Sequence, residues 1–198
     1  MEDIKKHANK LIAAIDARKG KGAATEILGI YAAPSGNETP EETALWAAGV
    51  IQRLEAFFHG EELISLREEC ACIKANKYST YNTKYFKELR LKYQDDDTAY
   101  LKAVAEFMDG RGRCGRKVEY KDGKIISHFS FSNACCCNLI KGGWKKPPSI
   151  TWCRCCQGTV SSIYQFVFTN KTMHTDIVET FATGGTDCVF ATWFTDKC

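Results

Sequence analysis

The stretch "TWCRCCQGTVSSIYQFVF" (Thr151–Phe168) combines two sequence patterns. Its first part places three cysteines within four positions, at Cys153, Cys155 and Cys156. From Cys155 onward, apolar residues recur at the spacing of one helix face. These residues are Val160, Ile163, Tyr164 and Val167. The stretch therefore predicts a helix that follows directly from a group of thiols.

The N-terminal part of the chain also predicts helices. Apolar residues form a helical stripe from Ile4 to Ile15. The segment "TPEE" indicates a helix start, because Thr39 can cap the helix, Pro40 suits the first helical position and Glu42 completes a capping box. Further helices are expected over 23–32, within 59–70 and from about residue 95 to Gly110.

After Gly110 the apolar pattern changes to that of strands. The segment "RKVEYKDGKIISHFSF" (116–131) predicts a hairpin with Asp122-Gly123 at its turn. A second hairpin is expected from "TMHTDIVETF" (172–181) and "CVFATWF" (188–194). The predicted fold class is therefore α+β: N-terminal helices packed on a mostly antiparallel sheet, which two C-terminal hairpins build with an intervening helix.

The length and composition are those of a compact globular protein. The 198 residues are 44% hydrophobic, and they divide into a helical part, 1–68, and a cysteine-rich part, 69–198, which we expect to form one unit. The net charge of +3 gives no argument for a nucleic-acid partner. The charged N-terminus lacks the apolar run of a signal peptide, and no apolar stretch approaches the ~20 residues that cross a bilayer. We therefore expect a cytoplasmic protein without nucleic-acid or membrane partners.

The cysteine content is high for such a protein. Eleven cysteines are an odd number, which intramolecular disulfides cannot pair completely. In a reducing cytoplasm, clustered cysteines more often bind metal or carry out redox chemistry than form structural disulfides. The pattern therefore favours a metal site or reactive thiols.

Three Cys-x-Cys pairs stand out among these cysteines. In an extended segment, residues i and i+2 point to the same face, so that both sulfurs of a pair can reach one metal ion. Two pairs would complete a four-thiolate zinc site, and the surplus of a third pair favours an iron–sulfur cluster or a multinuclear site. The basic residues Arg67, Arg154, Lys145 and Lys146 lie near the pairs in sequence and could offset thiolate charge. The predicted metal ligands are Cys70, Cys72, Cys135, Cys137, Cys153 and Cys155.

The C-terminal half resembles an uncharacterised family of cysteine-rich bacterial and archaeal proteins. The resemblance rests on Cys-x-Cys, a small residue and Gly, then an amphipathic helix, a strand, Gly-Gly-x-x-Cys-x-Phe and a last strand. More distantly, the chain resembles L-2-amino-thiazoline-4-carboxylic acid hydrolase-like proteins and vinyl-reductase-type small-molecule-binding domains. The resemblance implies an α+β fold with a ligand cavity between helix and sheet. The matching positions are Cys70, Cys72, Cys135, Cys137, Cys153, Cys155, Gly158, Gly185, Cys188 and Phe190.

Three functional interpretations remain open. The first is a metal or iron–sulfur centre beside a small-molecule pocket. The second is a thiol-dependent hydrolase of a small carbon–nitrogen or thio-compound, in which Arg154 or His128 would stabilise a thiolate. The third is a structural thiol-rich domain that binds a protein partner. Cys136 and Cys156 depart from the family pattern, and Cys188 is expected to be a small core residue rather than a ligand.

Overall fold

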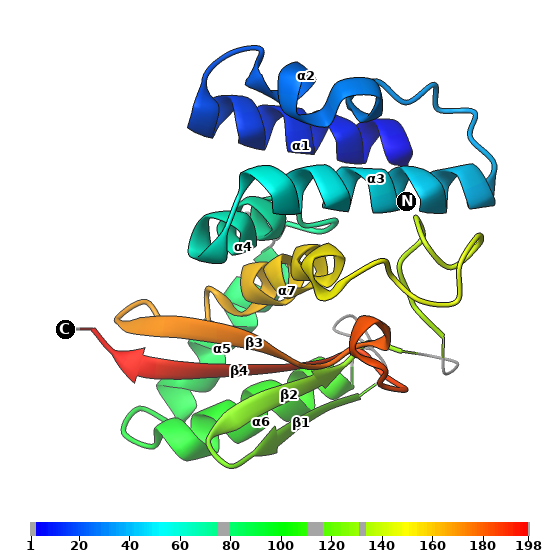
Figure 1. Ribbon diagram of the computed structural model, residues 1–198. Helices are drawn as coiled ribbons and strands as arrows, with labels where there is room; N and C mark the ends of the chain where they lie inside the picture. Colours follow the sequence, from blue (N-terminus) through cyan, green and yellow to red (C-terminus); the bar gives the residue numbers. More distant parts are fainter. Residues whose placement is uncertain (1–2, 75–79, 111–116, 131–133, 198) are drawn as a thin grey trace.

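The computed structural model describes residues 3–74, 80–110, 117–130 and 134–197, with residues 80–82 described by their backbone alone. In these residues helices are combined with one four-stranded antiparallel sheet, so the predicted α+β class is confirmed. The N-terminal helices form one layer, α7 lies beneath them, and the sheet lies beneath α7 (Figure 1). The helices are α1 (Ile4–Lys19), α2 (Ala23–Leu28), η1 (Gly29–Ala32), α3 (Pro40–Phe57), α4 (Gly60–Glu69), α5 (Thr80–Lys92), α6 (Asp97–Asp109), α7 (Ile150–Tyr164) and η2 (Phe181–Thr183).

The predicted helix start at "TPEE" is confirmed by the contacts at the beginning of α3. The Thr39 hydroxyl accepts a hydrogen bond from the Glu42 amide, and the Glu42 carboxylate accepts one from the Thr39 amide. The helix predicted over 23–32 is divided, because α2 ends at Leu28 and the chain continues as the 3-10 turn η1. Gly29 has φ +57° at this boundary, a conformation that glycine adopts without steric cost.

Helix α5 was not predicted from the sequence. Its residues carry a weak helical signal, and its stability comes from packing against α6, as is common for short helices. The Phe86 side chain is buried, and the Tyr85 ring stacks on Phe107 of α6 with 3.7 Å between ring centroids. Tertiary contact, rather than local sequence, therefore stabilises this helix.

Both predicted hairpins are present in the sheet. Its strands are β1 (Lys117–Lys121), β2 (Lys124–His128), β3 (Lys171–Glu179) and β4 (Val189–Asp196), in the order β1-β2-β4-β3. Because Ser127 pairs with Phe190 and Ile125 with Thr192, these four buried side chains share one face of the sheet. Helices α6 and α7 pack against the same face and complete a core with it.

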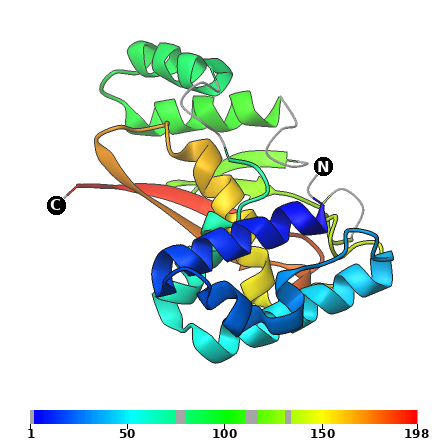
Figure 2. The ribbon, with the colours of Figure 1, turned by 90° about the horizontal axis from the view of Figure 1, so that it is seen from above.

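Helix α7 occupies the centre of the molecule. Seen from above, it runs between the N-terminal helices and the pair α5–α6, which lie at opposite ends (Figure 2). Trp152 at its start packs in the core of the N-terminal helices, whereas Val160 and Ile163 pack in the core over the sheet. The two cores therefore pack against α7 at different points along its length.

Candidate functional site

Helix α7 begins earlier than the sequence predicted. Ser149 caps it by accepting a hydrogen bond from the Thr151 amide, and the helix starts at Ile150, so all three cysteines of "TWCRCCQG" are helical. In a helix, residues i and i+2 differ by about 200° in direction. Cys153 and Cys155 therefore point to different sides, and the same-face geometry expected of an extended pair does not apply to them.

Five thiols form a continuous chain of contacts at α7. Cys155 is close enough to Cys72 and Cys156 for their thiols to lower its pKa. Cys136 is close enough to Cys156 and Cys188 for their thiols to lower its pKa. We call these residues the thiol chain; in order of contact they are Cys72, Cys155, Cys156, Cys136 and Cys188. Four separate segments thus contribute: the residues after α4, the residues before α7, α7 itself and the residue before β4.

The neighbouring thiols favour the thiolate form at two members of the thiol chain. The thiols of Cys156 and Cys72 lower the pKa of Cys155 well below its usual value. The thiols of Cys156 and Cys188 lower the pKa of Cys136 to about 4. Because a thiol carries one hydrogen, Cys156 can donate to Cys155 or to Cys136 but not to both at once. The protonation of Cys155 and that of Cys136 therefore depend on each other through Cys156.

The other predicted ligands surround the thiol chain without being hydrogen bonded to it. Cys70 donates to the Leu66 carbonyl at 3.3 Å, and burial raises its pKa to about 11. The Cys137 sulfur accepts from Trp152 Nε1 at 3.4 Å. Cys153 lies near Thr180, which acts to lower its pKa. Burial raises the pKa values of Cys135, Cys137 and Cys153 to about 12, so these thiols stay protonated at neutral pH.

A buried arginine lies beside the thiol chain. Arg67 has no exposed surface, and its guanidinium donates to the carbonyls of Thr151 at 3.3 Å and Trp152 at 3.1 Å. Its Nη1 lies 3.2 Å from Nε2 of His7. Since guanidinium nitrogens only donate, Nε2 is the acceptor, and the positive charge resides on Arg67. Among the described residues, no carboxylate lies within 4 Å of this charge, which instead favours the thiolate form of Cys155.

The structure divides the sequence-predicted residues into two groups. Of the six predicted ligands, Cys72 and Cys155 belong to the thiol chain, and the rest lie around it. Among the basic residues, Arg67 faces the thiols, whereas Arg154 bonds to Gln157 on another face of α7 and Lys145 and Lys146 are exposed. Cys114 and Cys198 lie outside the described residues.

Three members of the thiol chain were not among the metal ligands predicted from the sequence. Cys136 and Cys156 were treated as additions to the pattern, yet they occupy its middle. The core position expected for Cys188 is confirmed, since it is 4% exposed and packs with Phe190, but its thiol also contacts Cys136.

His7 was missed by the sequence analysis, although its place on the apolar stripe of α1, between Ile4 and Leu11, marked it as a buried polar residue. Within the described ranges, no group of three or more His, Cys, Asp or Glu side chains is arranged so that it could hold a metal ion.

Asp187 fixes the backbone next to Cys188. Its Oδ1 accepts from the amides of Ser130 at 2.9 Å and Cys188 at 2.7 Å, and its Oδ2 lies 3.0 Å from Nδ1 of His128, whose Nε2 faces Glu119. Burial acts to raise the pKa of Asp187, but these hydrogen bonds outweigh it and hold the pKa below its usual value. The carboxylate thus attaches the Cys188 end of the thiol chain to β2.

Replacing Asp187 by asparagine is expected to cost about 1–2 kcal/mol at neutral pH, because the charge-assisted bond from His128 is lost. The native pKa of Asp187 is lowered, so its contribution is present above the unfolded-state value of about 3.9 and is lost as pH falls through the native value. Urea unfolding of the wild type and Asp187→Asn should therefore differ more at pH ~7 than at pH ~3. A difference that does not change with pH would contradict this assignment.

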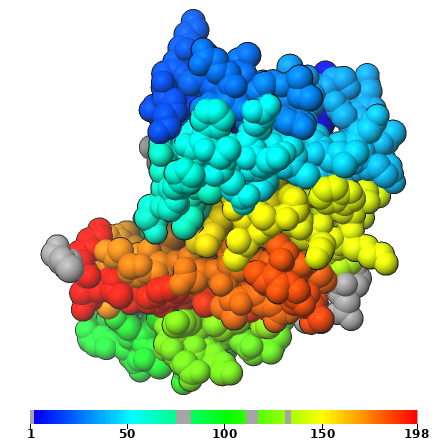
Figure 3. All heavy atoms as spheres, in the orientation of Figure 1, coloured from blue at the N-terminus to red at the C-terminus, as the bar shows by residue number. Residues whose placement is uncertain are grey.

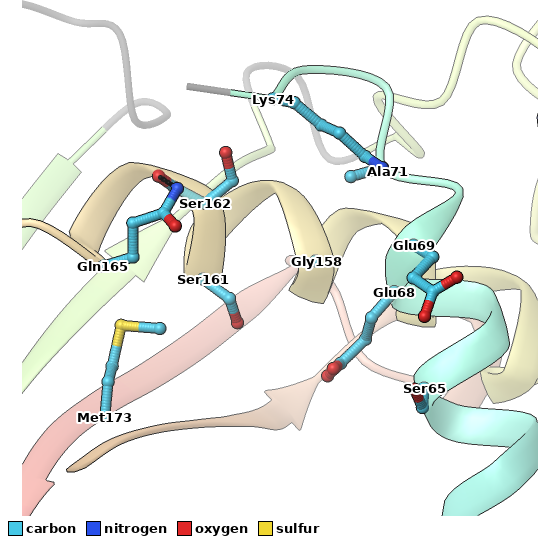
Figure 4. A pocket seen from close by; sticks show the side chains of 10 residues that line it. All are labelled: Ser65, Glu68, Glu69, Ala71, Lys74, Gly158, Ser161, Ser162, Gln165 and Met173. Atoms are coloured by element: carbon cyan, nitrogen blue, oxygen red, sulfur yellow. Dashed lines mark hydrogen bonds between the residues drawn. The ribbon is translucent and has the colours of Figure 1, made fainter. Parts of the chain in front are cut away.

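A groove runs along the side of α7 that carries Gly158 and Ser161. In the space-filling view, α4 (cyan) lies above β3 (orange), with α7 between them (Figure 3). Two cavities of about 410 and 580 Å³ share Glu68, Ser161 and Met173 and so form one continuous groove. Glu68 and Ser161 extend toward the same space from α4 and α7 (Figure 4). The groove is close to the thiols in sequence, because Ala71 at its margin precedes Cys72.

Comparison with known proteins places the chain in a family. A family model described as "Family of unknown function (DUF6144)" matches residues 1–197, so the chain belongs to this family. No curated protein matches the sequence. In the part of the chain that the structure describes, no helix has both the length and the apolar surface that crossing a membrane requires.

Proposed function

We propose that this protein uses the thiol chain to bind a soft metal ion, zinc or the iron of an iron–sulfur cluster, in the cytoplasm. The observation that carries the proposal is the gathering of five free thiols from four segments beside a buried arginine that has no carboxylate partner among the described residues. Thiolates are the ligands that these metals prefer, and a fixed cation offsets the negative charge of a multi-thiolate site. Free cysteines also suit a reducing compartment.

The sulfurs form an open chain rather than a closed ring, so metal binding requires changes of side-chain rotamer. Cys72, Cys136 and Cys156 are half-buried, which leaves them accessible to an incoming ion. The adjacent groove would serve as the small-molecule pocket beside the centre.

The test is anaerobic purification followed by metal analysis and a visible spectrum. Iron with acid-labile sulfide and absorption near ~400 nm would indicate a cluster, and about one zinc per chain without colour a zinc site. Cys155→Ser and Cys136→Ser should each reduce the metal content by more than half, because they remove central members of the thiol chain. Cys153→Ala is the control, since Cys153 is also buried on α7 but is not a member of the thiol chain.

The outcomes separate the competing interpretations. If Cys153→Ala loses the metal and Cys136→Ser keeps it, the ligands are the Cys-x-Cys pairs and not the thiol chain. If no metal is found and one thiol reacts much faster than the rest with iodoacetamide, the protein is better described as a thiol-dependent hydrolase. That second function is favoured by Cys136, a half-buried thiolate that two neighbouring thiols stabilise.

A further inference from the structure

The groove beside α7 contains a positive charge that the protein holds in a fixed position. Arg154 Nη1 donates to the Gln157 side-chain oxygen at 2.6 Å. Gln157 is 4% exposed, and its own amide nitrogen donates to the Thr175 carbonyl of β3 at 2.6 Å. The guanidinium is therefore oriented by a buried amide that is anchored to the sheet. Such an arrangement lowers the conformational entropy lost when an anion binds.

Arg154 is not neutralised by a neighbouring acid. Within the described ranges, no carboxylate lies within 4 Å of its guanidinium, although Glu61, Glu68 and Asp176 line the same 580 Å³ cavity. The bond to Gln157 uses one of the five N–H groups of the arginine. A planar, forked donor of this kind matches a carboxylate.

The acids of the groove form the complementary half of the site. Glu68 is half-buried on α4, and Figure 4 shows its carboxylate directed into the groove. Burial raises the pKa of Glu68, the nearby Arg154 opposes this, and the carboxylates of Glu61 and Asp176 add to it. A cation bound between these acids would relieve their mutual repulsion. Apolar side chains, those of Ile64, Met173 and Trp193, line the remainder of the cavity.

We propose that the groove binds a small zwitterion of the α-amino acid type. Arg154 binds its carboxylate, Glu68 binds its ammonium group, and the apolar side chains contact the rest of the molecule. This inference rests on the proposal that the groove is a ligand pocket, and it does not depend on the metal at the thiol chain.

The probes are the proteinogenic L-amino acids, each tested at millimolar concentration by isothermal titration calorimetry with the purified full chain. At least one should bind, and its affinity should fall about tenfold or more in both Arg154→Met and Glu68→Gln, as expected for loss of a charge-assisted hydrogen bond. Arg53→Met, which changes an exposed arginine on α3, is the control and should bind normally. The deaminated acid and the decarboxylated amine of the same amino acid should each bind at least about tenfold more weakly.

Several results would overturn the proposal. One is that no amino acid binds. Another is that the deaminated acid or the decarboxylated amine binds as tightly as the amino acid. A third is that only one of the two groove variants loses affinity. Melting curves of both variants show whether they are folded. Metal content measured on the same samples distinguishes the two proposals. Bound metal without amino-acid binding would contradict only the zwitterion site. Amino-acid binding without metal would contradict only the metal centre.

Discussion

Arg67→Met is expected to lower the free energy of unfolding by about 3–5 kcal/mol, the range seen when a buried charged contact is broken. The substitution removes hydrogen bonds to two backbone carbonyls at the start of α7 and a contact of the guanidinium with the Trp152 ring at 4.6 Å. It also leaves His7 Nε2 without its donor. For a chain of this length the melting temperature should fall by about 10 °C or more, measured by circular dichroism.

Two further variants separate charge from packing at this position. Arg67→Lys keeps the charge but loses the fork of donors, so its stability should lie between that of Arg67→Met and the wild type. The positive charge also favours the thiolate form of Cys155. Arg53→Met should have little effect. A melting temperature of Arg67→Met equal to that of Arg53→Met would contradict the structural role given to Arg67.

Gly158→Ala is expected to destabilise the protein by about 2–3 kcal/mol, because two backbones approach too closely for a methyl group. A Cβ at this position would lie 2.2 Å from the Glu68 carbonyl oxygen and 2.7 Å from the Glu68 Cα. These atoms belong to the backbone of α4, so no change of side-chain rotamer can relieve the overlap. Alanine has a higher helix propensity by about 1 kcal/mol, which is too small to compensate.

Gly110→Ala is the matched control for this prediction. Gly110 has φ −61°, and an added Cβ would meet its nearest atom at 3.6 Å, an ordinary contact. Urea unfolding should therefore show a change within about 1 kcal/mol for Gly110→Ala and a clear loss for Gly158→Ala. Equal stabilities of the two variants would show that α4 can move away from α7 at little cost.

The elements predicted correctly are those whose signals lie within a few residues. The capping box at Thr39 and the Asp122-Gly123 turn are determined by local hydrogen bonds and backbone preferences, so the sequence alone identified them. Helix α5 was missed because it is stabilised by its contacts with α6, and such tertiary contacts cannot be inferred from a local sequence pattern.

The site was predicted in part for a similar reason. The gathering of thiols was anticipated, but the partners were assigned as though the Cys-x-Cys pairs were extended. The helical rotation of α7 separates Cys153 from Cys155 and turns Cys156 toward Cys136. Cys155 and Cys156 are adjacent in the sequence, and in the thiol chain each contacts a different further neighbour.

The origin of the thiol chain in four separate segments also determines when it can form. Cys72 precedes the strands of the sheet, whereas Cys188 immediately precedes β4, the last strand of the sequence. During synthesis the N-terminal helices can pack while the rest of the chain is still inside the ribosome, but the chain of sulfurs stays incomplete until β4 has emerged. Any metal that the thiol chain binds would therefore be loaded only after Cys188 has emerged. A nascent polypeptide that stalls earlier would expose the other four thiols of the thiol chain.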